Sequence, residues 1–467
     1  MLLKDFNRIH FIGIGGISMS SLAEILQHKG KKVSGSDGVQ SAVTDSLVKM
    51  GINVVIGKKK NITDDIDLVV YTAAVNESNP ELVAARASKA TVIDRAELVG
   101  MLMLEYKHPI SVAGTHGKTT TSSLVTEILL QANVNPTVSI GGMLPSIGGN
   151  YKIGSDDYFV LETCEYCDSF LKFNPHSAII LNVDKDHIDY FKNLDNIYKS
   201  FNKFANRLPS DGFLVINNEI PRLSEVIAGI KCSYETYGKD SKSDWYPTNV
   251  TYDSMGHHSY TVNYKGQKIA EVSLSIPGDH NVYNSLAAFA LCYKYGIPVD
   301  AIVKGIDNYH GTDRRFQYKG SFNGVKVIDD YAHHPTEIAA TINSARANDI
   351  NKLWIVFQPH TYSRTYELLD DFAKVLAKAD NVVLVDIYAS REKDTGLVSS
   401  KDLADKIVEH KGNVEYCGTF ENAENYILSH CNPQDMLITM GAGDIVKLEK
   451  NWYQRSNAQS YPSYPQF

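Results

Sequence analysis

The stretch HPISVAGTHGKTTTSSLVTEILLQAN, residues 108–133, decides the fold of this chain. A short apolar run is followed by a glycine loop and then by apolar residues at helical spacing. A glycine loop between a strand and the start of a helix is typical of phosphate-binding sites, because backbone N–H groups there face the phosphate oxygens. The stretch therefore predicts an α/β domain that binds a nucleotide.

The loop in this stretch, GTHGKTTT, is a compact form of the phosphate-binding loop (P-loop). Lys118 can neutralise the β- and γ-phosphates of ATP, and the hydroxyl of Thr119 can reach a magnesium ion. An ordinary strand-to-helix turn would need neither residue. We therefore expect ATP and Mg2+ as cofactors. The expected phosphate contacts come from Gly114, Thr115, His116, Gly117, Lys118, Thr119 and Thr120.

Strand and helix patterns alternate on both sides of this loop, which predicts an α/β chain of three domains. The first and last domains have a Rossmann-like pattern, and the central one has that of a P-loop ATPase with a mostly parallel sheet. Alternating residues at about 234–268 predict antiparallel strands appended to the central sheet. We expect domains at 1–107, 108–312 and 313–455, and a flexible tail at 456–467.

A second glycine turn lies near the N-terminus, in HFIGIGGISMS. Gly13, Gly15 and Gly16 resemble a dinucleotide fingerprint. Ser18 stands where a third glycine would be, and Asp37 lies where a ribose-binding acid is expected. We therefore expect this turn to hold the diphosphate of a nucleotide-linked ligand. A tight turn without any ligand is the alternative.

Two acidic segments, LETCEYC and NVDKDHIDYF, follow apolar strands of the central domain. The carboxyl ends of parallel strands meet at the ligand crevice, so these side chains can approach Thr119 and the ATP phosphates. We assign Glu162 and His187 as ligands of magnesium or of a second metal ion. A zinc site at Cys164 and Cys167 is disfavoured, because no second pair of cysteines or histidines has suitable spacing.

Histidine and arginine residues gather at the ends of the predicted strands after residue 311. Arg314 and Arg315 begin the third domain, where an arginine can reach the ATP phosphates only when the domains close. The remaining group suits a small substrate that carries a carboxylate, which arginine can bind through two hydrogen bonds. This group consists of Tyr331, His333, His334, His360 and Arg364.

The composition excludes several classes of protein. A net charge of −8 argues against a general binder of nucleic acid or anionic membrane, since such partners need a basic surface. The sequence has no run of about 18 apolar residues and no signal-peptide layout, so we expect a cytoplasmic protein without membrane insertion. The six cysteines suit a reducing compartment better than a disulfide framework.

Seven motifs, taken in order along nearly the whole chain, resemble those of the Mur ligase family. They are HFIGIGGISMS, GTHGKTTT, ETCEYCDSF, NVDKDHIDYF, DDYAHHPTEI, QPHTYSRT and GAGD. The resemblance implies an ATP-dependent amide-bond ligase of peptidoglycan precursor synthesis that works through an acyl phosphate. Within the family, the motifs are most similar to those of the members that join L-alanine to UDP-N-acetylmuramic acid.

The resemblance also implies roles for individual residues. The UDP-sugar would be bound by Gly13, Gly15, Gly16, Ser18 and Asp37. ATP and metal would be held by Lys118, Thr119, Glu162, His187, Asn281, Arg314 and Asp330, of which Asn281 and Asp330 contact adenosine. The amino-acid pocket would be lined by Tyr331, His333, His360 and Arg364. The expected catalytic residues are Lys118, His187, Arg314, His333, His360 and Arg364.

Other functions stay open on sequence alone. A recycling ligase of the same family would add a whole peptide to the same UDP-sugar. A nicotinamide-dependent oxidoreductase would use the N-terminal glycine turn but would leave GTHGKTT unexplained. A regulatory protein would bind ATP without forming an amide. Some Mur ligases carry a carbamylated lysine near the metal, and neither Lys199 nor Lys203 fits that motif. The assembly is expected to be a monomer or a homodimer.

Overall fold

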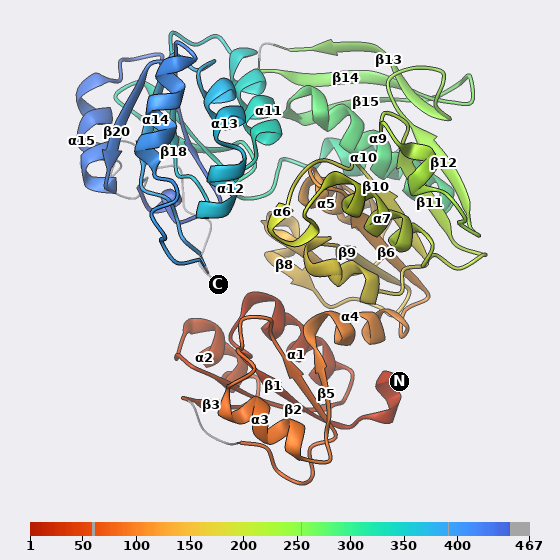
Figure 1. The fold of residues 1–467 in the computed structure, drawn as a ribbon. Coiled ribbons are helices and arrows are strands. Elements are labelled where there is room, and N and C mark those ends of the chain that lie inside the picture. Colours follow the sequence, from red (N-terminus) through yellow and green to blue (C-terminus); the bar gives the residue numbers. More distant parts are fainter. Residues whose placement is uncertain (58–60, 254, 391, 449–467) are drawn as a thin grey trace.

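The computed structural model describes residues 1–57, 61–253, 255–390 and 392–448. These residues form three β-sheets, each built from a separate part of the chain and flanked by helices (Figure 1). The α/β class and the three-part architecture predicted from the sequence are confirmed. The predicted tail at 456–467 lies outside the described residues.

The first sheet has five parallel strands in the order β3-β2-β1-β4-β5. The strand order reverses between β1 and β4, so the carboxyl end of β1, where the glycine turn follows, lies at the topological switch point. The elements are η1 (Leu3–Asp5), β1 (Arg8–Ile12), α1 (Ile17–His28), β2 (Lys32–Asp37), α2 (Ala42–Lys49), β3 (Asn53–Ile56), β4 (Leu68–Tyr71), α3 (Pro80–Ala87), β5 (Thr91–Asp94) and α4 (Arg95–Met103).

The central sheet has ten strands in the order β15-β14-β13-β12-β11-β10-β6-β9-β7-β8. The elements before β11 are β6 (His108–Ala113), α5 (Lys118–Gln131), β7 (Thr137–Leu144), η2 (Pro145–Ile147), β8 (Gly149–Lys152), β9 (Tyr158–Glu162), η3 (Tyr166–Lys172), β10 (Ser177–Ile180), α6 (Ile188–Phe191) and α7 (Leu194–Ala205). Those that follow are β11 (Phe213–Asn217), α8 (Leu223–Val226), β12 (Ser233–Tyr237), β13 (Trp245–Tyr252), β14 (His257–Tyr264), β15 (Gln267–Pro277), α9 (Asp279–Lys294) and α10 (Val299–Asp307).

The strands from β12 to β7 in this order run parallel, whereas β13, β14 and β15 pair in antiparallel fashion. The antiparallel extension therefore begins at β13. The strand β12 falls within the predicted antiparallel stretch but pairs parallel with β11. Helices α5, α9 and α10 pack against one another beside the sheet, and their apolar side chains belong to one buried core.

The third sheet has the order β16-β17-β21-β18-β19-β20, and only the pairing of β16 with β17 is antiparallel among the described strands. The elements are β16 (Gln317–Phe322), β17 (Val325–Asp330), α11 (Pro335–Arg346), β18 (Leu353–Phe357), α12 (Tyr362–Glu367), α13 (Leu369–Leu376), β19 (Asn381–Val385), α14 (Ser400–Glu409), β20 (Val414–Gly418), α15 (Phe420–His430), β21 (Met436–Met440) and η4 (Ile445–Leu448).

The first and central parts meet where α4 packs on η3. A Cβ atom at Gly100 of α4 would come 2.0 Å from the carbonyl oxygen of Lys172, so the close approach of the two backbones requires glycine there. Two ion pairs, the exposed one of Lys29 with Asp156 and the partly buried one of Lys172 with Asp94, add to this junction. Steric packing thus fixes the first part against the central one.

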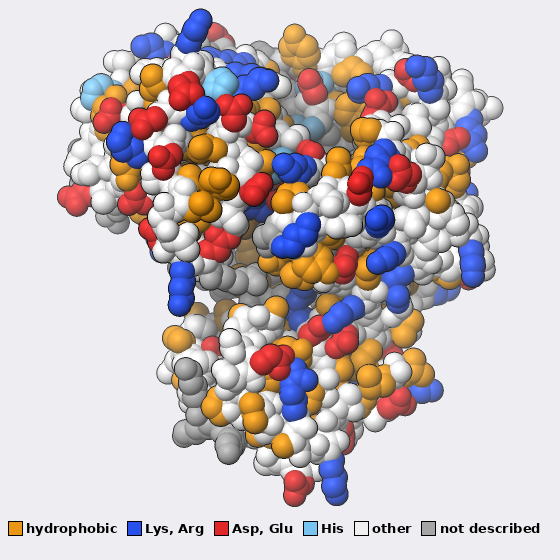
Figure 2. All heavy atoms as spheres, viewed as in Figure 1, with side chains coloured by type: hydrophobic (Ala, Val, Ile, Leu, Met, Phe, Trp, Pro, Cys, Tyr) orange, Lys and Arg blue, Asp and Glu red, His pale blue; other side chains and the backbone are white. Residues whose placement is uncertain are grey.

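The molecular surface carries mixed charges. On the face shown in Figure 2, basic and acidic side chains are interspersed over all three parts. In the described part of the chain, every helix is too short or too polar to cross a membrane.

Candidate active site

The P-loop connects β6 to α5, and its backbone depends on glycine. Gly114 and Gly117 have φ angles of 140° and 83°, which favour glycine. A Cβ atom at Gly117 would also lie 2.7 Å from the side-chain oxygen of Asn284. The loop therefore passes close to α9 and brings Lys118 to the first position of α5.

Lys118 is held by its own loop and by one carboxylate. Its ammonium group donates to the carbonyl oxygens of Gly114 and Thr115 and lies 3.2 Å from the carboxylate of Glu165. Burial opposes the charge of Lys118, but Glu165 and neighbouring groups outweigh it and raise the pKa of the lysine. Lys118 therefore stays charged where phosphate is expected.

The predicted pair of Thr119 and Glu162 is in direct contact. The Thr119 hydroxyl donates to Glu162 at 3.0 Å, and the backbone N–H of Gly141 donates to the other oxygen of Glu162 at 2.6 Å. Arg315 donates to the Thr119 hydroxyl oxygen at 3.2 Å. These contacts bring two oxygen ligands suited to Mg2+ and one cation to the start of α5.

His187 lies on the other side of Lys118. Its Nε2 atom is 3.9 Å from Glu165 and 3.6 Å from Asp186, and its ring lies against Tyr166. Glu165, which is 2% exposed, therefore stands between Lys118 and His187. The sequence pointed to Glu162 and His187 as the metal ligands; Glu162 contacts Thr119, and Glu165 lies beside His187.

The two lysines considered for carbamylation lie on α7, which follows His187 in the chain. Lys199 and Lys203 are both exposed on α7.

A cavity of about 450 Å³ lies between the central and third parts of the chain. Asn281 at the start of α9 and Asp330 at the end of β17 both line it, as does Glu337 of α11. Asp330 accepts hydrogen bonds from two backbone N–H groups and from the Thr341 hydroxyl. Burial raises the pKa of Asp330 to about 6. The two residues expected at adenosine thus reach one cavity from opposite sides.

Arg314 and Arg315, where the central part passes into the third part, point in different directions. Arg314 donates to Asp329 at 3.0 Å and to the carbonyl oxygens of Gly441 and Gly443, so it binds within the third part. Arg315 instead reaches Thr119 of the P-loop. The structure therefore gives Arg315 the place beside the P-loop that we assigned to Arg314. The cause is local, since Arg314 has a left-handed φ of 62°.

A second cavity, of about 210 Å³, also separates the central and third parts. His187, His360 and Arg364 line it. Arg364 lies 3.3 Å from His360 and donates to Asp186 at 3.0 Å. Burial opposes the negative charge of Asp186, but Arg364 prevails and holds its pKa well below the usual range.

The histidine group predicted around this cavity comes together. His333 makes ring contacts with both Tyr331 and His360. Burial lowers the pKa of His333 to about 4, so its ring is neutral near pH 7. Four of the five residues expected at a carboxylate-bearing substrate therefore form one cluster, with Arg364 already paired to Asp186, whereas His334 lies beside His116.

In the N-terminal glycine turn, Asp37 braces the backbone. Its carboxylate accepts from the N–H of Gly15 at 2.8 Å and from that of Val39 at 3.2 Å. Gly13 has a φ of 83°, and Ser18 accepts a hydrogen bond from Arg95 at 3.1 Å. The turn is preorganised, and both oxygens of Asp37 already have backbone partners.

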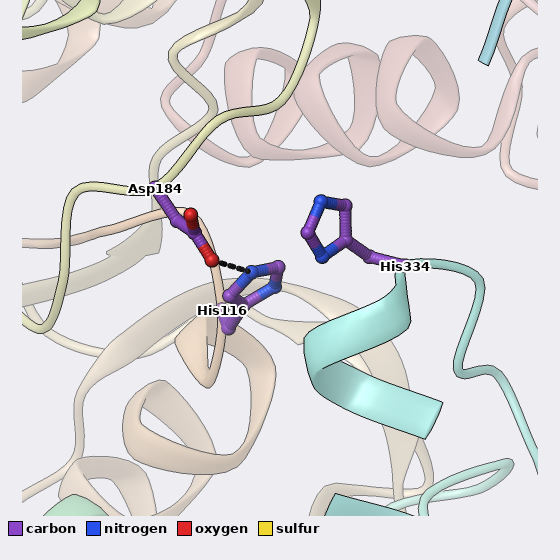
Figure 3. Close-up of side chains that lie close together, drawn as sticks. All are labelled: His116, Asp184 and His334. Atoms are coloured by element: carbon purple, nitrogen blue, oxygen red, sulfur yellow. Dashed lines mark hydrogen bonds and ion pairs between the residues drawn. The ribbon is translucent and has the colours of Figure 1, made fainter. Parts of the chain in front are cut away.

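His116 of the P-loop forms a cluster with Asp184 and His334 (Figure 3). Its Nε2 atom is 3.4 Å from Asp184, and its Nδ1 atom is 3.2 Å from Glu337. The ring of His334, at the start of α11, lies 4.7 Å from the ring of His116. Sequence reasoning assigned His116 to phosphate, but its ring nitrogens face carboxylates.

From the sequence we named Arg315 but gave the phosphate role to Arg314, missed Glu337 as a site residue and left Glu165 unassigned. Glu165 and Glu337 lie within the quoted motifs, and Arg315 directly follows Arg314. The motifs carry no signal for which of two adjacent arginines, or which of several carboxylates, turns toward the P-loop.

Comparison with known proteins covers nearly the whole chain. The family described as "Mur ligase family, catalytic domain" matches residues 8–107. "Mur ligase middle domain" matches residues 112–292, and "Mur ligase, glutamate ligase domain" matches residues 314–443.

Individual relatives extend this match. Proteins named UDP-N-acetylmuramate–L-alanine ligase from Agathobacter rectalis and Lachnospira eligens are 51% and 52% identical, and each alignment covers 95% of this chain and 98% of the relative. The solved UDP-N-acetylmuramate-alanine ligase of Thermotoga maritima has a TM-score of 0.78 and 29% identity, covering 96% of this chain and 98% of that one. A murein peptide ligase from Psychrobacter arcticus, at 24% identity and a TM-score of 0.71 over 96% and 98% of the two chains, shares the fold. As the order of motifs predicts, the chain belongs to the Mur ligase family.

Proposed function

We propose that this chain joins L-alanine to the lactyl carboxylate of UDP-N-acetylmuramic acid in an ATP-dependent reaction of peptidoglycan precursor synthesis in the cytoplasm. The observation that carries the proposal is the 51% identity, over 95% of the chain, to a relative named UDP-N-acetylmuramate–L-alanine ligase. The contacts around the P-loop supply the groups that such a reaction needs. All of these groups come from one chain, which allows a monomer or a homodimer.

ATP binding is assigned to the larger cavity and the P-loop. Adenosine would lie near Asn281 and Asp330, which line the cavity from the central and third parts. The phosphates would then extend along the start of α5, where backbone N–H groups and the charged Lys118 favour anions. Arg315, which touches Thr119, completes the cationic end of this path.

We assign Mg2+ to the oxygen and nitrogen donors that lie beside the P-loop. Thr119 and Glu162 offer oxygen atoms, and Glu165 and His187 offer one further oxygen and one nitrogen. Oxygen ligands are those that Mg2+ prefers. When bound, the ion would offset negative charge on the transferring phosphoryl group.

In the first chemical step, the muramyl carboxylate oxygen attacks the γ-phosphorus of ATP. A carboxylate–phosphorus bond forms and the bond to the β-phosphate oxygen breaks, which yields an acyl phosphate and ADP. Lys118 and Arg315 lie where they can stabilise the charge that spreads over the transferring group.

In the second step, the neutral amine of L-alanine attacks the acyl carbon and expels phosphate, and the amine loses its extra proton. We assign the carboxylate of the amino acid to Arg364, in exchange for Asp186, because a bidentate contact with arginine suits a carboxylate. His333 and His360 lie beside this position. Exclusion of water matters here, because acyl phosphates hydrolyse.

The first test measures release of ADP and phosphate with ATP, Mg2+ and UDP-N-acetylmuramic acid, with and without L-alanine, glycine, L-serine or a muramyl tripeptide. Release that requires both the UDP-sugar and L-alanine supports the proposal. A requirement for the tripeptide would indicate the recycling reaction, and turnover without the UDP-sugar would refute a ligase of this class. Lys118→Met, which keeps the volume of the side chain, and Lys118→Ala should both abolish release.

A further inference from the structure

His116 occupies a position in the P-loop, but it contacts carboxylates from two parts of the molecule. Its Nε2 atom lies 3.4 Å from Asp184, which follows β10 in the central part. Its Nδ1 atom lies 3.2 Å from Glu337, in the first turn of α11 in the third part. The His116 side chain is 13% exposed and that of Glu337 is 16% exposed, so their contact is largely shielded from water, whereas the Asp184 side chain is 42% exposed.

Hydrogen-bond chemistry fixes the charge of this ring. An ionised carboxylate only accepts hydrogen bonds, so both nitrogens of His116 must donate, and the ring is an imidazolium. Burial opposes that charge, but Asp184 and Glu337 raise the pKa of His116 to about 9. The neighbouring ring of His334 differs: its Nε2 donates to the carbonyl oxygen of Lys185, and its Nδ1 accepts from the N–H of Thr336.

His334 is therefore neutral. Burial and the nearby charge of His116 both lower its pKa. One charged and one neutral ring can lie side by side without charge repulsion. A metal ion between them would have to displace the partners of both rings, which favours a docking role over a metal site for the cluster in Figure 3.

Further contacts join α11 to the central part around the same histidine. The Thr336 hydroxyl donates to Asp184 at 3.0 Å, and His334 donates to the carbonyl oxygen of Lys185 at 3.0 Å. The other oxygen of Glu337 accepts from the backbone N–H of His333 at 3.1 Å. A continuous path therefore runs from the P-loop through His116 and Glu337 to the histidine cluster of the smaller cavity.

We propose that His116 is a positioning residue, and that the Asp184–His116–Glu337 bridge docks the third part of the chain on the P-loop and thereby places His333 and its neighbours for the attack by the amine. The inference rests on the proposed function, since it concerns the amino-acid step of that reaction. It gives His116 a role distinct from that of a phosphate ligand, because neither ring nitrogen is left to face a phosphate.

The test is a double-mutant cycle in the full-length protein with His116→Asn, Glu337→Gln and the combined variant. Each single change should lower kcat/KM for L-alanine by about tenfold to a hundredfold, the range for loss of a charged hydrogen bond. The combined variant should be about as impaired as the worse single variant, because both changes break the same bridge. Effects that multiply would overturn the inference.

A phosphate-ligand role for His116 would produce a different pattern. The His116→Asn change would then raise KM for ATP. The rise would be the same whether position 337 carries the native Glu or Gln. Thr336→Val, which removes a separate hydrogen bond to Asp184, provides a milder second variant if either carboxamide variant unfolds. It should raise KM for L-alanine by a factor of a few, and no change would also count against the bridge.

His410→Asn is the matched control, because it removes a similar histidine–carboxylate contact, with Asp370, on the exposed surface of the third part. Its kinetics should equal those of the unmodified protein. A failure of the proposed function itself would be seen in the unmodified protein, as absence of turnover with the UDP-sugar and L-alanine. A failure of the bridge is seen only by comparison of variants of an active protein.

Discussion

The two junctions of this chain are built in opposite ways. Where the first part meets the central one, α4 packs on η3 so closely that Gly100 cannot carry a side chain, and the ion pairs there are exposed or only partly buried. Where the third part meets the central one, partly or fully buried charges such as Arg364 and Asp186 face each other beside two cavities.

The difference indicates which junction moves. A steric contact between backbones holds one arrangement, because packed groups have no second position of similar energy. Charged contacts beside cavities can exchange partners with ligands that carry the same charges, such as phosphate or a carboxylate. We therefore expect the third part to open and close over the central one while the first part stays fixed.

The largest difference in effect should lie between substitutions of Arg315, which should impair turnover, and of Arg314, which should impair stability. Arg315→Ala should lower kcat by about a hundredfold to a thousandfold with little change in stability, because it removes a cation from the phosphate path. Arg314→Ala should lower the free energy of unfolding by about 3–5 kcal/mol, because it leaves the fully buried Asp329 without its partner. Steady-state kinetics and urea unfolding measure the two effects.

Arg→Lys changes at the same two positions serve as controls, since they keep the charge. If Arg314→Ala impaired kcat while unfolding was unaffected, the original assignment of phosphate to Arg314 would stand.

The docking of the third part should weaken at alkaline pH. Burial opposes the charge of His116, but Asp184 and Glu337 together raise its pKa to about 9 from an ordinary value of about 6.5, and of these two carboxylates only Glu337 belongs to the third part. A raised pKa means that the contribution is complete below the ordinary value and is lost as pH rises through about 9. Because Asp184 stays beside His116 in the open form, the equilibrium between docked and open forms should shift by less than about a hundredfold, measured by X-ray scattering or by fluorescence transfer between the two parts.

The groups that face His116 are Asp184, Glu337, His334 and Lys118. We expect all four to keep their charge state as pH rises to about 9, so that only the His116 ring changes charge. His116→Asn should therefore flatten the pH dependence. An unchanged transition in that variant would assign it to another group.

The fixed junction should respond to a single methyl group. Gly100→Ala places a Cβ atom 2.0 Å from the Lys172 carbonyl oxygen and should destabilise the protein by about 1–3 kcal/mol, despite the better helix propensity of alanine. Thermal unfolding measures this loss. Gly38→Ala, at a position with no atom within 4 Å, is the matched control and should leave the midpoint nearly unchanged. Equal effects would mean that the junction is not sterically fixed.

The sequence predicted the parts of the site that depend on strand ends and on loop chemistry. Thr119 and Glu162 are in contact because β6 and β9 are neighbours in a parallel sheet and both end at the same edge. His333, His360 and Arg364 meet for the same reason in the third sheet. The order of the motifs and the period of the apolar residues predict which segments are strands and which residues follow their carboxyl ends.

Other features depend on single dihedral angles or on distant partners, which a sequence pattern does not encode. Arg314 and Arg315 are adjacent and chemically identical, and the left-handed backbone at Arg314 separates their directions. Glu337 lies 221 positions from His116, so only the folded chain shows that they pair. Asp37 looked like a ribose ligand, but its position equally allows the brace for Gly15 that is found.

The smallest effect should come from the ion pairs of the fixed junction. Asp156→Asn removes the contact with Lys29, in which the Asp156 side chain is 70% exposed. Because water screens such a pair, its loss should change the free energy of unfolding by less than about 1 kcal/mol and leave kcat unaltered. Asp186→Asn, which breaks the buried pair with Arg364 at the other junction, should instead impair turnover with L-alanine. If the exposed pair proved to be the more costly one to break, charge rather than steric packing would hold the first junction, and the first part would then be free to move with salt concentration.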